Sequence, residues 1–175
     1  MGLQPTNFRD VGDALSLWLE PSPLPRGRLL RGGKFDELTA LADLGSARTI
    51  LNLRRGPDPT HLAARLLHVP ASDELENYDT RQHRVRQWLG RALDILADPA
   101  TEWPVYVHCT SGRDRTGVVI AAALISIGVP RNVVFEEYML SDGADADAIT
   151  LALDGMAHVV KTAPAGLRAA LLGGG

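Results

Sequence analysis

The chain has 175 residues, 45% of them apolar, which is typical of one folded domain with a sizeable core. Its formal net charge of −3 argues against nucleic-acid binding through a basic surface. No apolar run approaches the ~18 residues of a membrane span, and residues 1–10 lack the pattern of a secretion signal. We therefore expect a single domain over residues 1–175 in the cytoplasm, without an integral membrane segment; secretion without a visible signal stays open.

The first half of the chain predicts strands and one short helix. Apolar runs bounded by glycine, proline or polar residues predict four strands, at residues 15–19, 28–30, 49–53 and 65–69. Residues 37–45 have the pattern of a short helix, with Asp36 as its N-cap and Gly45 as its end.

The second half is mainly helical. Apolar residues spaced three and four apart predict an amphipathic helix over 77–97. A strand at 105–108 and an apolar helix at about 115–127 follow. Further helical patterns cover 132–140 and 146–160, and residues from about 170 to 175 are expected to be frayed. This alternation predicts an α/β fold with a mainly parallel central sheet flanked by helices.

The only cysteine, Cys109, lies in the stretch VHCTSGRDRTG at residues 107–117, between the strand and the apolar helix. Glycine in such a loop lets successive N–H groups face inward, and the helix N-terminus adds a positive dipole. Thiols in such places ionise more readily than free cysteine. Arg115 can bind two oxygens of one phosphate, and Ser111 and Thr116 supply hydroxyls. The stretch therefore predicts an anion-binding loop around a nucleophile.

Other interpretations of this stretch are weaker. Gly112 and Gly117 have the spacing of a nucleotide-binding Walker loop, but Val118 and Val119 stand where Lys and Ser or Thr are required. One cysteine and His108 do not make a four-ligand metal site, so no metal is expected. A structural cysteine in a glycine turn, a sulfurtransferase and an inactive phosphate-binding module remain alternatives.

HCTSGRDRTG resembles the H-C-x(5)-R-[ST] loop of the protein-tyrosine phosphatase superfamily. Further segments resemble a bacterial and fungal tyrosine phosphatase branch, namely residues 7–13 (NFRDVGD), 30–33 (LRGG), 38–39 (LT), 50–54 (ILNLR) and 137–141 (EYMLS). The chain departs from that pattern at Asp13, where glycine is usual, and at Asn52, where aspartate is usual. Residues after 142 carry no resemblance.

The resemblance implies a dual-specificity-phosphatase-like fold and a reaction without a metal or organic cofactor. Cys109 would attack phosphorus and form a phosphocysteine, while Arg115 would stabilise the transferring phosphoryl group. The loop residues that would bind the phosphate with Arg115 are Thr110, Ser111, Gly112, Arg113 and Thr116. His108 would support the loop and Arg54 would have a supporting role, with pairing to Asp58 as the alternative for Arg54.

The general acid has two candidates. Superfamily members usually carry this aspartate some thirty-odd residues before the cysteine, and Asp73 lies 36 positions upstream. Asp114 lies in the loop itself, as in lipid phosphatases with the sequence D-R-T, and it is slightly preferred. Nearby competitors are Glu74, Glu76 and Asp79. Asp114 pairing with a neighbouring arginine, or Asp73 capping a helix, is the structural alternative.

The expected substrate is a phosphotyrosine-containing protein, and phosphoserine or phosphothreonine is a further option. Arg113 stands where lipid-active relatives often carry lysine, which makes a phosphoinositide the alternative substrate. The sequence carries no indication of the oligomeric state.

Overall fold

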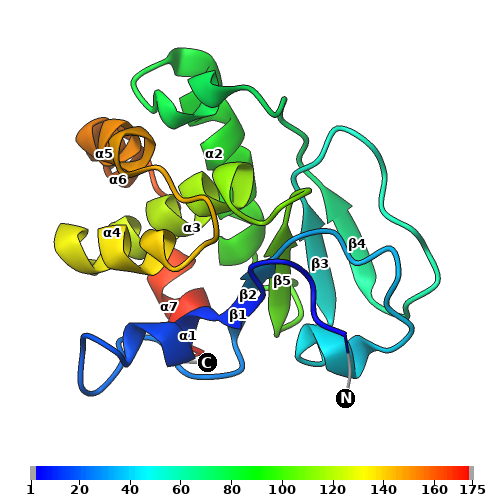
Figure 1. The fold of residues 1–175 in the computed structure, drawn as a ribbon. Helices are drawn as coiled ribbons and strands as arrows, with labels where there is room; N and C mark the ends of the chain where they lie inside the picture. Colours follow the sequence, from blue (N-terminus) through cyan, green and yellow to red (C-terminus); the bar gives the residue numbers. More distant parts are fainter. Residues whose placement is uncertain (1–2, 174–175) are drawn as a thin grey trace.

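The computed structural model describes residues 3–173, and its centre is one five-stranded sheet (Figure 1). The strands are β1 (Arg9–Asp10), β2 (Leu29–Gly32), β3 (Thr49–Asn52), β4 (Arg65–His68) and β5 (Val105–His108). Their order across the sheet is β1-β2-β5-β3-β4, and all neighbours are parallel except β1, which is antiparallel to β2. The predicted α/β class with a mainly parallel sheet is confirmed.

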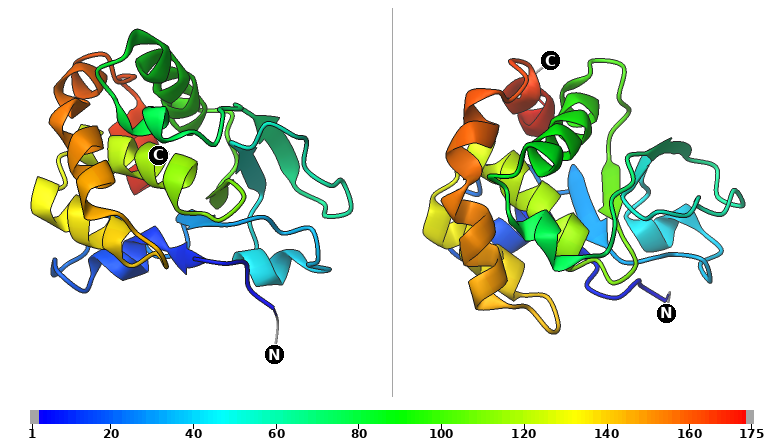
Figure 2. Two further views of the ribbon diagram at one scale, coloured as in Figure 1. Left: turned by 45° about the horizontal axis from the view of Figure 1, so that its top comes forward. Right: turned by 90° about the horizontal axis from the view of Figure 1, so that it is seen from above.

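Helices cover one face of this sheet, as Figures 1 and 2 both show. The α-helices are α1 (Val11–Leu15), α2 (His83–Ala97), α3 (Asp114–Ser126), α4 (Arg131–Met139), α5 (Ala146–Asp154), α6 (Met156–Lys161) and α7 (Leu167–Leu172). Two short 3-10 helices complete the set, η1 (Leu41–Leu44) and η2 (Leu75–Tyr78). Of the helices within residues 3–173, none combines the length and the apolar character that a membrane crossing requires.

The strand residues divide the core into two parts, because successive side chains of a strand point to opposite faces. Leu51 and Val107 pack in the cluster between the sheet and the helices. Ile50 and Tyr106, one residue earlier in the same strands, pack in a smaller cluster on the other face. The apolar helix α3 is buried along most of its length, which explains why its sequence is not amphipathic.

The carboxyl ends of the three central strands lie level with one another. Asn52 of β3 and Gly32 of β2 are both aligned with His108 of β5. The loops that follow these strands therefore meet at one edge of the sheet, which is where parallel sheets place their ligands. Cys109 begins the loop that follows β5.

Two predictions of local structure were wrong. Residues 15–19 form an apolar run like that of a strand, but Leu15 ends α1, residues 16–19 follow in turns and bends, and Leu17 is exposed. Helix α1 forms here because the Asp10 side chain caps its N-terminus by accepting from the Asp13 N–H. The tail was expected to fray from about residue 170, yet α7 continues to Leu172 because Leu167 and Leu171, one helical turn apart, are buried in the main core. Residues 174–175 lie outside the described part.

Three predicted helices differ in extent. Gly45 ends η1 in the left-handed conformation, as expected, but Asp36 does not cap it and the N-cap is Ala40. The helix expected from residue 77 begins at His83, after η2. The pattern over 146–160 is interrupted at Gly155, whose close approach to the Thr80 side chain leaves no room for a Cβ.

Candidate active site

Residues 109–115, which we call the cysteine loop, join the carboxyl end of β5 to the N-terminus of α3. The Cys109 side chain is buried, with 1% of the residue exposed. Within residues 3–173, the amide N–H groups of residues 110–113 have no protein acceptor. Free amides at the N-terminus of a 13-residue helix favour an anion, because the helix dipole adds to their partial positive charge.

Gly112 gives the cysteine loop its shape. Its φ of +72° lies in the left-handed region, which side-chain-bearing residues rarely adopt. A Cβ at this position would lie 2.3 Å from the carbonyl carbon of Gly32 in β2. The loop can therefore pack directly against the end of β2 only with glycine at this position.

Arg115 connects the cysteine loop to the segment that follows β4. It is 6% exposed, and its Nη1 donates to the Ala71 carbonyl at 3.0 Å. Its Nη2 donates to Thr110 Oγ1 at 3.3 Å. The guanidinium is thus held across the loop by two oxygens, with its plane fixed for binding an oxyanion.

Beside Arg115 lies a pocket of about 330 Å³, which we call the Arg115 pocket. Its lining residues are Arg54, Arg55, Gly56, Pro57, Asp73, Thr110 and Arg115. Four residues that the sequence singled out, from three separate segments, therefore come together here. Of all the lining residues, three are basic, namely Arg54, Arg55 and Arg115, which favours an anionic ligand.

The two candidate acids occupy different surroundings. Asp73 is exposed and lines the Arg115 pocket. Asp114 does not line that pocket, and its carboxylate accepts from Arg113 Nε and Nη2 at 3.0 Å each and from Tyr78 Oη at 2.5 Å. Burial raises the pKa of Asp114, but the hydrogen bonds from Arg113 and Tyr78 outweigh it and leave that pKa below its usual value. The competitors Glu74, Glu76 and Asp79 do not line the Arg115 pocket either.

Arg113 is directed to the α4–α5 side of the loop. Its guanidinium forms the bidentate pair with Asp114 described above. A Cβ added to Gly143, between α4 and α5, would lie 2.4 Å from Arg113 Nη1, so the arginine packs closely on that glycine. The structural alternative for Asp114, pairing with a neighbouring arginine, is what the structure contains.

Tyr78 extends the contacts of Asp114 into the helical layer. Its hydroxyl also lies 2.8 Å from Tyr138 Oη, and Tyr138 Oη accepts from the Asp145 N–H at 3.2 Å. Burial and the hydrogen bond to Asp114 raise the pKa of Tyr78 far above its ordinary value, so its hydroxyl stays protonated. Sequence reasoning missed Tyr78, which lies 36 residues from its partner.

His108 supports the start of the cysteine loop. Its Nε2 lies 2.9 Å from Asp58 Oδ2, and its Nδ1 lies 3.2 Å from the carbonyl oxygen of Cys109. His108 and the Asp58 side chain are both buried. The imidazole therefore bridges a carboxylate and the Cys109 backbone, and its supporting role stays a prediction.

Arg54 adopts the alternative that the sequence left open. Its Nη2 lies 3.0 Å from Asp58 Oδ1 and 3.4 Å from Asp36 Oδ1. Asn52, where relatives usually have aspartate, accepts from the Arg54 N–H at 2.8 Å and donates to the Gly56 carbonyl at 2.9 Å. An amide can do both, so the substitution keeps this turn hydrogen-bonded.

A buried ion-pair network lies on the opposite side of the cysteine loop. Arg31 is 0% exposed, and its Nη1 lies 2.6 Å from Glu137 Oε1. Arg9 Nε lies 2.6 Å from the other oxygen, Glu137 Oε2. Arg31 Nη2 donates to the Gly112 carbonyl at 3.0 Å, so the network holds the loop directly. Burial lowers the pKa of Arg31 to about 10, opposed by Glu137, and the guanidinium stays charged.

This network explains the dispersed sequence segments. Asn7 adds a further bond, from its Nδ2 to the Ser111 carbonyl at 2.9 Å. Residues 7–13, 30–33 and 137–141, which resemble the phosphatase branch, therefore meet at the cysteine loop. Sequence reasoning identified these segments without assigning them a role. Their shared resemblance was the available signal.

Thr116 follows Arg115 at the start of α3. The residue is fully buried, and within residues 3–173 its hydroxyl has no hydrogen-bond partner. Buried hydroxyls are usually hydrogen-bonded, and those of Ser72 and Ser126 are the other exceptions in the described residues. Across residues 3–173, no group of three or more His, Cys, Asp or Glu side chains is arranged to hold a metal ion.

Comparison with known proteins identifies the family of this chain. The sequence model described as "Tyrosine phosphatase family" matches residues 3–171. The chain is 27% identical over 191 aligned positions to the triple specificity protein phosphatase PtpB of Mycobacterium tuberculosis. That alignment covers 78% of this chain and 66% of PtpB, so the chain spans just under two thirds of its relative's length.

Solved structures show the same fold. The catalytic domain of the PP-IP phosphatase SIW14 from S. cerevisiae superposes with a TM-score of 0.63 at 20% identity, covering 87% of each chain. TpbA of P. aeruginosa superposes with a TM-score of 0.53 at 23% identity, covering 86% of this chain and 88% of its own. Because the family model matches nearly the whole length of the chain, the chain belongs to the tyrosine phosphatase family.

Proposed function

We propose that this chain is a cysteine-dependent phosphomonoesterase that hydrolyses phosphotyrosine in proteins. The observation that carries the proposal is the cysteine loop, which brings the buried Cys109, the free amides of residues 110–113 and the Arg115 guanidinium together at the N-terminus of α3. The family membership and the phosphatase names of the relatives support it.

In the first step the Cys109 thiolate attacks phosphorus and forms the S–P bond, while the bond between phosphorus and the tyrosine oxygen breaks. Arg115 and the loop amides bind the three equatorial oxygens and stabilise their charge in the transition state. The leaving oxygen takes a proton from a carboxylic acid, for which we propose Asp73.

In the second step water attacks the phosphocysteine, the S–P bond breaks and inorganic phosphate leaves. Asp73, now ionised, takes the proton from that water, which restores its acid form. The unpartnered Thr116 hydroxyl donates to the departing Cys109 thiolate. His108 keeps the Cys109 backbone in position through its contact with the carbonyl oxygen. Cys109, Asp73 and Arg115 thus return to their starting states.

Asp73 suits the acid role better than Asp114 for two reasons. Asp73 lines the Arg115 pocket, where the leaving group of a bound phosphate ester would lie. Asp114 has a lowered pKa and already accepts three hydrogen bonds, so a proton on it would displace Arg113 or Tyr78.

A phosphoinositide is the other candidate substrate, because Arg113 could bind an additional phosphate. The Arg113 guanidinium is paired with Asp114 and packs on Gly143, so it is not free to bind a second phosphate. The observation therefore favours a phosphoprotein. A cytoplasmic location, consistent with such a substrate, stays a prediction that cell fractionation tests.

The test is the Cys109→Ser variant on an aryl phosphate and on a phosphotyrosine peptide. We expect turnover to fall below detection, because serine is a far weaker nucleophile, while vanadate or phosphate still binds. Glu102→Gln, which changes an exposed side chain just before β5 and far from Cys109, serves as the control and retains turnover. Turnover retained by Cys109→Ser would overturn the proposal.

The same assay separates the remaining classes. A sulfurtransferase would transfer sulfur and release no phosphate from an aryl phosphate. A non-catalytic phosphate-recognition module would bind the phosphopeptide without turnover in either form. Phosphate release that vanadate inhibits is the result expected here.

A further inference from the structure

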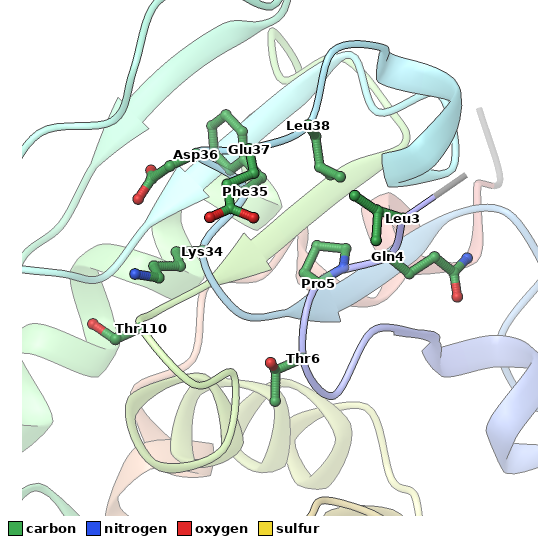
Figure 3. Close-up of a pocket in the computed structure, with 10 residues that line it drawn as sticks. All are labelled: Leu3, Gln4, Pro5, Thr6, Lys34, Phe35, Asp36, Glu37, Leu38 and Thr110. Carbon is green, nitrogen blue, oxygen red and sulfur yellow. The ribbon is translucent and has the colours of Figure 1, made fainter. Parts of the chain in front are cut away.

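A second hollow opens next to the Arg115 pocket, and Thr110 lines both. Its volume is about 300 Å³ (Figure 3). Its walls come from the N-terminal segment at residues 3–6 and from the loop after β2 at residues 34–38. A substrate whose phosphate lies over the cysteine loop would therefore pass directly from one hollow into the other.

Hydrogen bonds fix both walls relative to the cysteine loop. The Lys34 N–H donates to the Thr110 carbonyl at 3.0 Å, and the Gly33 N–H donates to the Thr6 carbonyl at 2.8 Å. Phe35 and Leu38 are buried in the smaller core cluster, which anchors the loop after β2. The hollow is therefore a built feature of the fold.

The hollow is lined by apolar side chains, two carboxylates and one cation, Lys34. Leu3 is 68% exposed and lines it together with Leu38, while Asp36 and Glu37 contribute exposed carboxylates. In Figure 3, Lys34 lies on the side of Thr110, and Leu3 and Leu38 lie at the opposite end. The Asp36 carboxylate is already paired, because its Oδ1 lies 3.4 Å from Arg54 Nη2.

Glu37 is the carboxylate of this hollow that is available to bind a positively charged ligand. Within residues 3–173 it takes part in no ion pair, in contrast to Asp36. An occupant with an aliphatic stem and a positive head would cover the exposed Leu3 and reach Glu37. Lys34, toward Thr110, would face the phosphate rather than this head.

We propose that this hollow is a subsite for an arginine or lysine that flanks the phosphorylated residue of a protein substrate. The inference rests on the proposed function and names its substrate class. A phosphoinositide headgroup reaching into the same hollow would bring further phosphates toward Asp36 and Glu37, and like charges repel. Glu37, which has no cation paired with it in residues 3–173, is therefore expected to disfavour a polyphosphorylated ligand at this end of the hollow.

The experiment compares phosphotyrosine peptides that differ only in the flanking residues, which are arginine, alanine or glutamate. We expect kcat/KM of the wild-type protein to be about two- to five-fold higher for arginine than for alanine, the size of one exposed ion pair. Glutamate should be worse than alanine. A soluble phosphoinositide should be a poorer substrate than every arginine peptide.

Glu37→Arg is the diagnostic variant, because it should invert the preference between the arginine and glutamate peptides. Glu102→Gln is the matched control: it removes an exposed glutamate just before β5, at the strand end opposite Cys109, and should leave the preference unchanged. The readout is a ratio between peptides, so a general loss of activity or folding does not imitate it.

Equal kcat/KM for all peptides, or an unchanged preference in Glu37→Arg, would overturn the subsite. Turnover of a plain aryl phosphate in the same experiment would still support the proposed function. Faster turnover of the phosphoinositide would overturn it as well. Absence of aryl phosphate turnover would overturn the proposed function, and the subsite with it.

Discussion

The cysteine loop is held differently on its two sides. On the side of β2 and α4, the Gly112 carbonyl accepts from Arg31, which is fully buried and paired with Glu137. On the side of the Arg115 pocket, Arg55 and Asp73 are exposed. One side is a closed ion-pair network, and the other is an open surface.

This difference assigns the two sides different tasks. Buried charges are stable only while every partner is present, so the α4 side can hold the loop in one shape. Exposed charges contribute little to stability, because water and salt screen them, and they are free to contact a substrate. Substitutions on the first side should therefore lower stability, and those on the second should lower activity.

The largest effect on stability is expected from Glu137→Gln. It leaves the buried Arg31 and the partly buried Arg9 without a carboxylate, which costs about 3–5 kcal/mol of unfolding free energy. Urea unfolding followed by circular dichroism measures the change.

Asp154→Asn is the control for this prediction, because it breaks an ion pair whose side chains are about half exposed. Its cost should stay within about 1 kcal/mol. If the two variants lost equal stability, the contrast between the buried and the open side would not hold.

The next effect concerns the open side. Asp73→Asn should lower kcat about a hundredfold, or about 2.7 kcal/mol, for a phosphate ester with a poor leaving group. An aryl phosphate with a good leaving group needs less protonation and should be slowed much less. Unfolding free energy should change little, because Asp73 is exposed.

Asp114→Asn, measured on the same two esters, is the paired variant. Its slowing should be similar for both, because we assign Asp114 to loop structure. If Asp114→Asn slowed only the ester with the poorer leaving group and Asp73→Asn stayed active, Asp114 would be the general acid and Asp73 would not. If neither variant slowed that ester, both assignments would be wrong.

The smallest effect is a pH dependence of stability at Asp114. Its pKa is lowered in the folded protein, so the ionised form stabilises the fold above the unfolded pKa of about 3.9. That stabilisation is lost as the pH falls through the folded pKa. The stability difference between wild type and Asp114→Asn should therefore be largest near neutral pH and shrink below about pH 4. Urea titrations at several pH values measure it, and a difference that grew on acidification would contradict the assignment.

Much of the fold was predictable because its signals are local. The apolar runs at β3, β4 and β5 and the periodicity of α2 identify their elements without knowledge of the tertiary structure. Residues 15–19 misled because a short apolar run also occurs at the end of a capped helix and in the turn after it. The burial of Leu167 and Leu171 against the main core decides α7, and no local signal near the C-terminus carried that contact.

The candidate site divides in the same way. Cys109 and Arg115 lie in one continuous motif, so their proximity followed from the sequence. Arg31 and Glu137 are 106 positions apart, and their pairing depends on which strand and helix become neighbours. The choice between Asp73 and Asp114 needed the side-chain partners of each carboxylate, which spacing does not contain.

The central claim is that Cys109 carries the phosphoryl group during turnover, and chemical trapping tests it most directly. The wild-type protein is mixed with a phosphotyrosine peptide, quenched in acid within milliseconds to seconds, and mapped by mass spectrometry. We expect one phosphoryl group on the peptide that contains Cys109 and none after the substrate is exhausted. Turnover without a phosphorylated Cys109 peptide at any quench time, together with activity in Cys109→Ser, would contradict the claim.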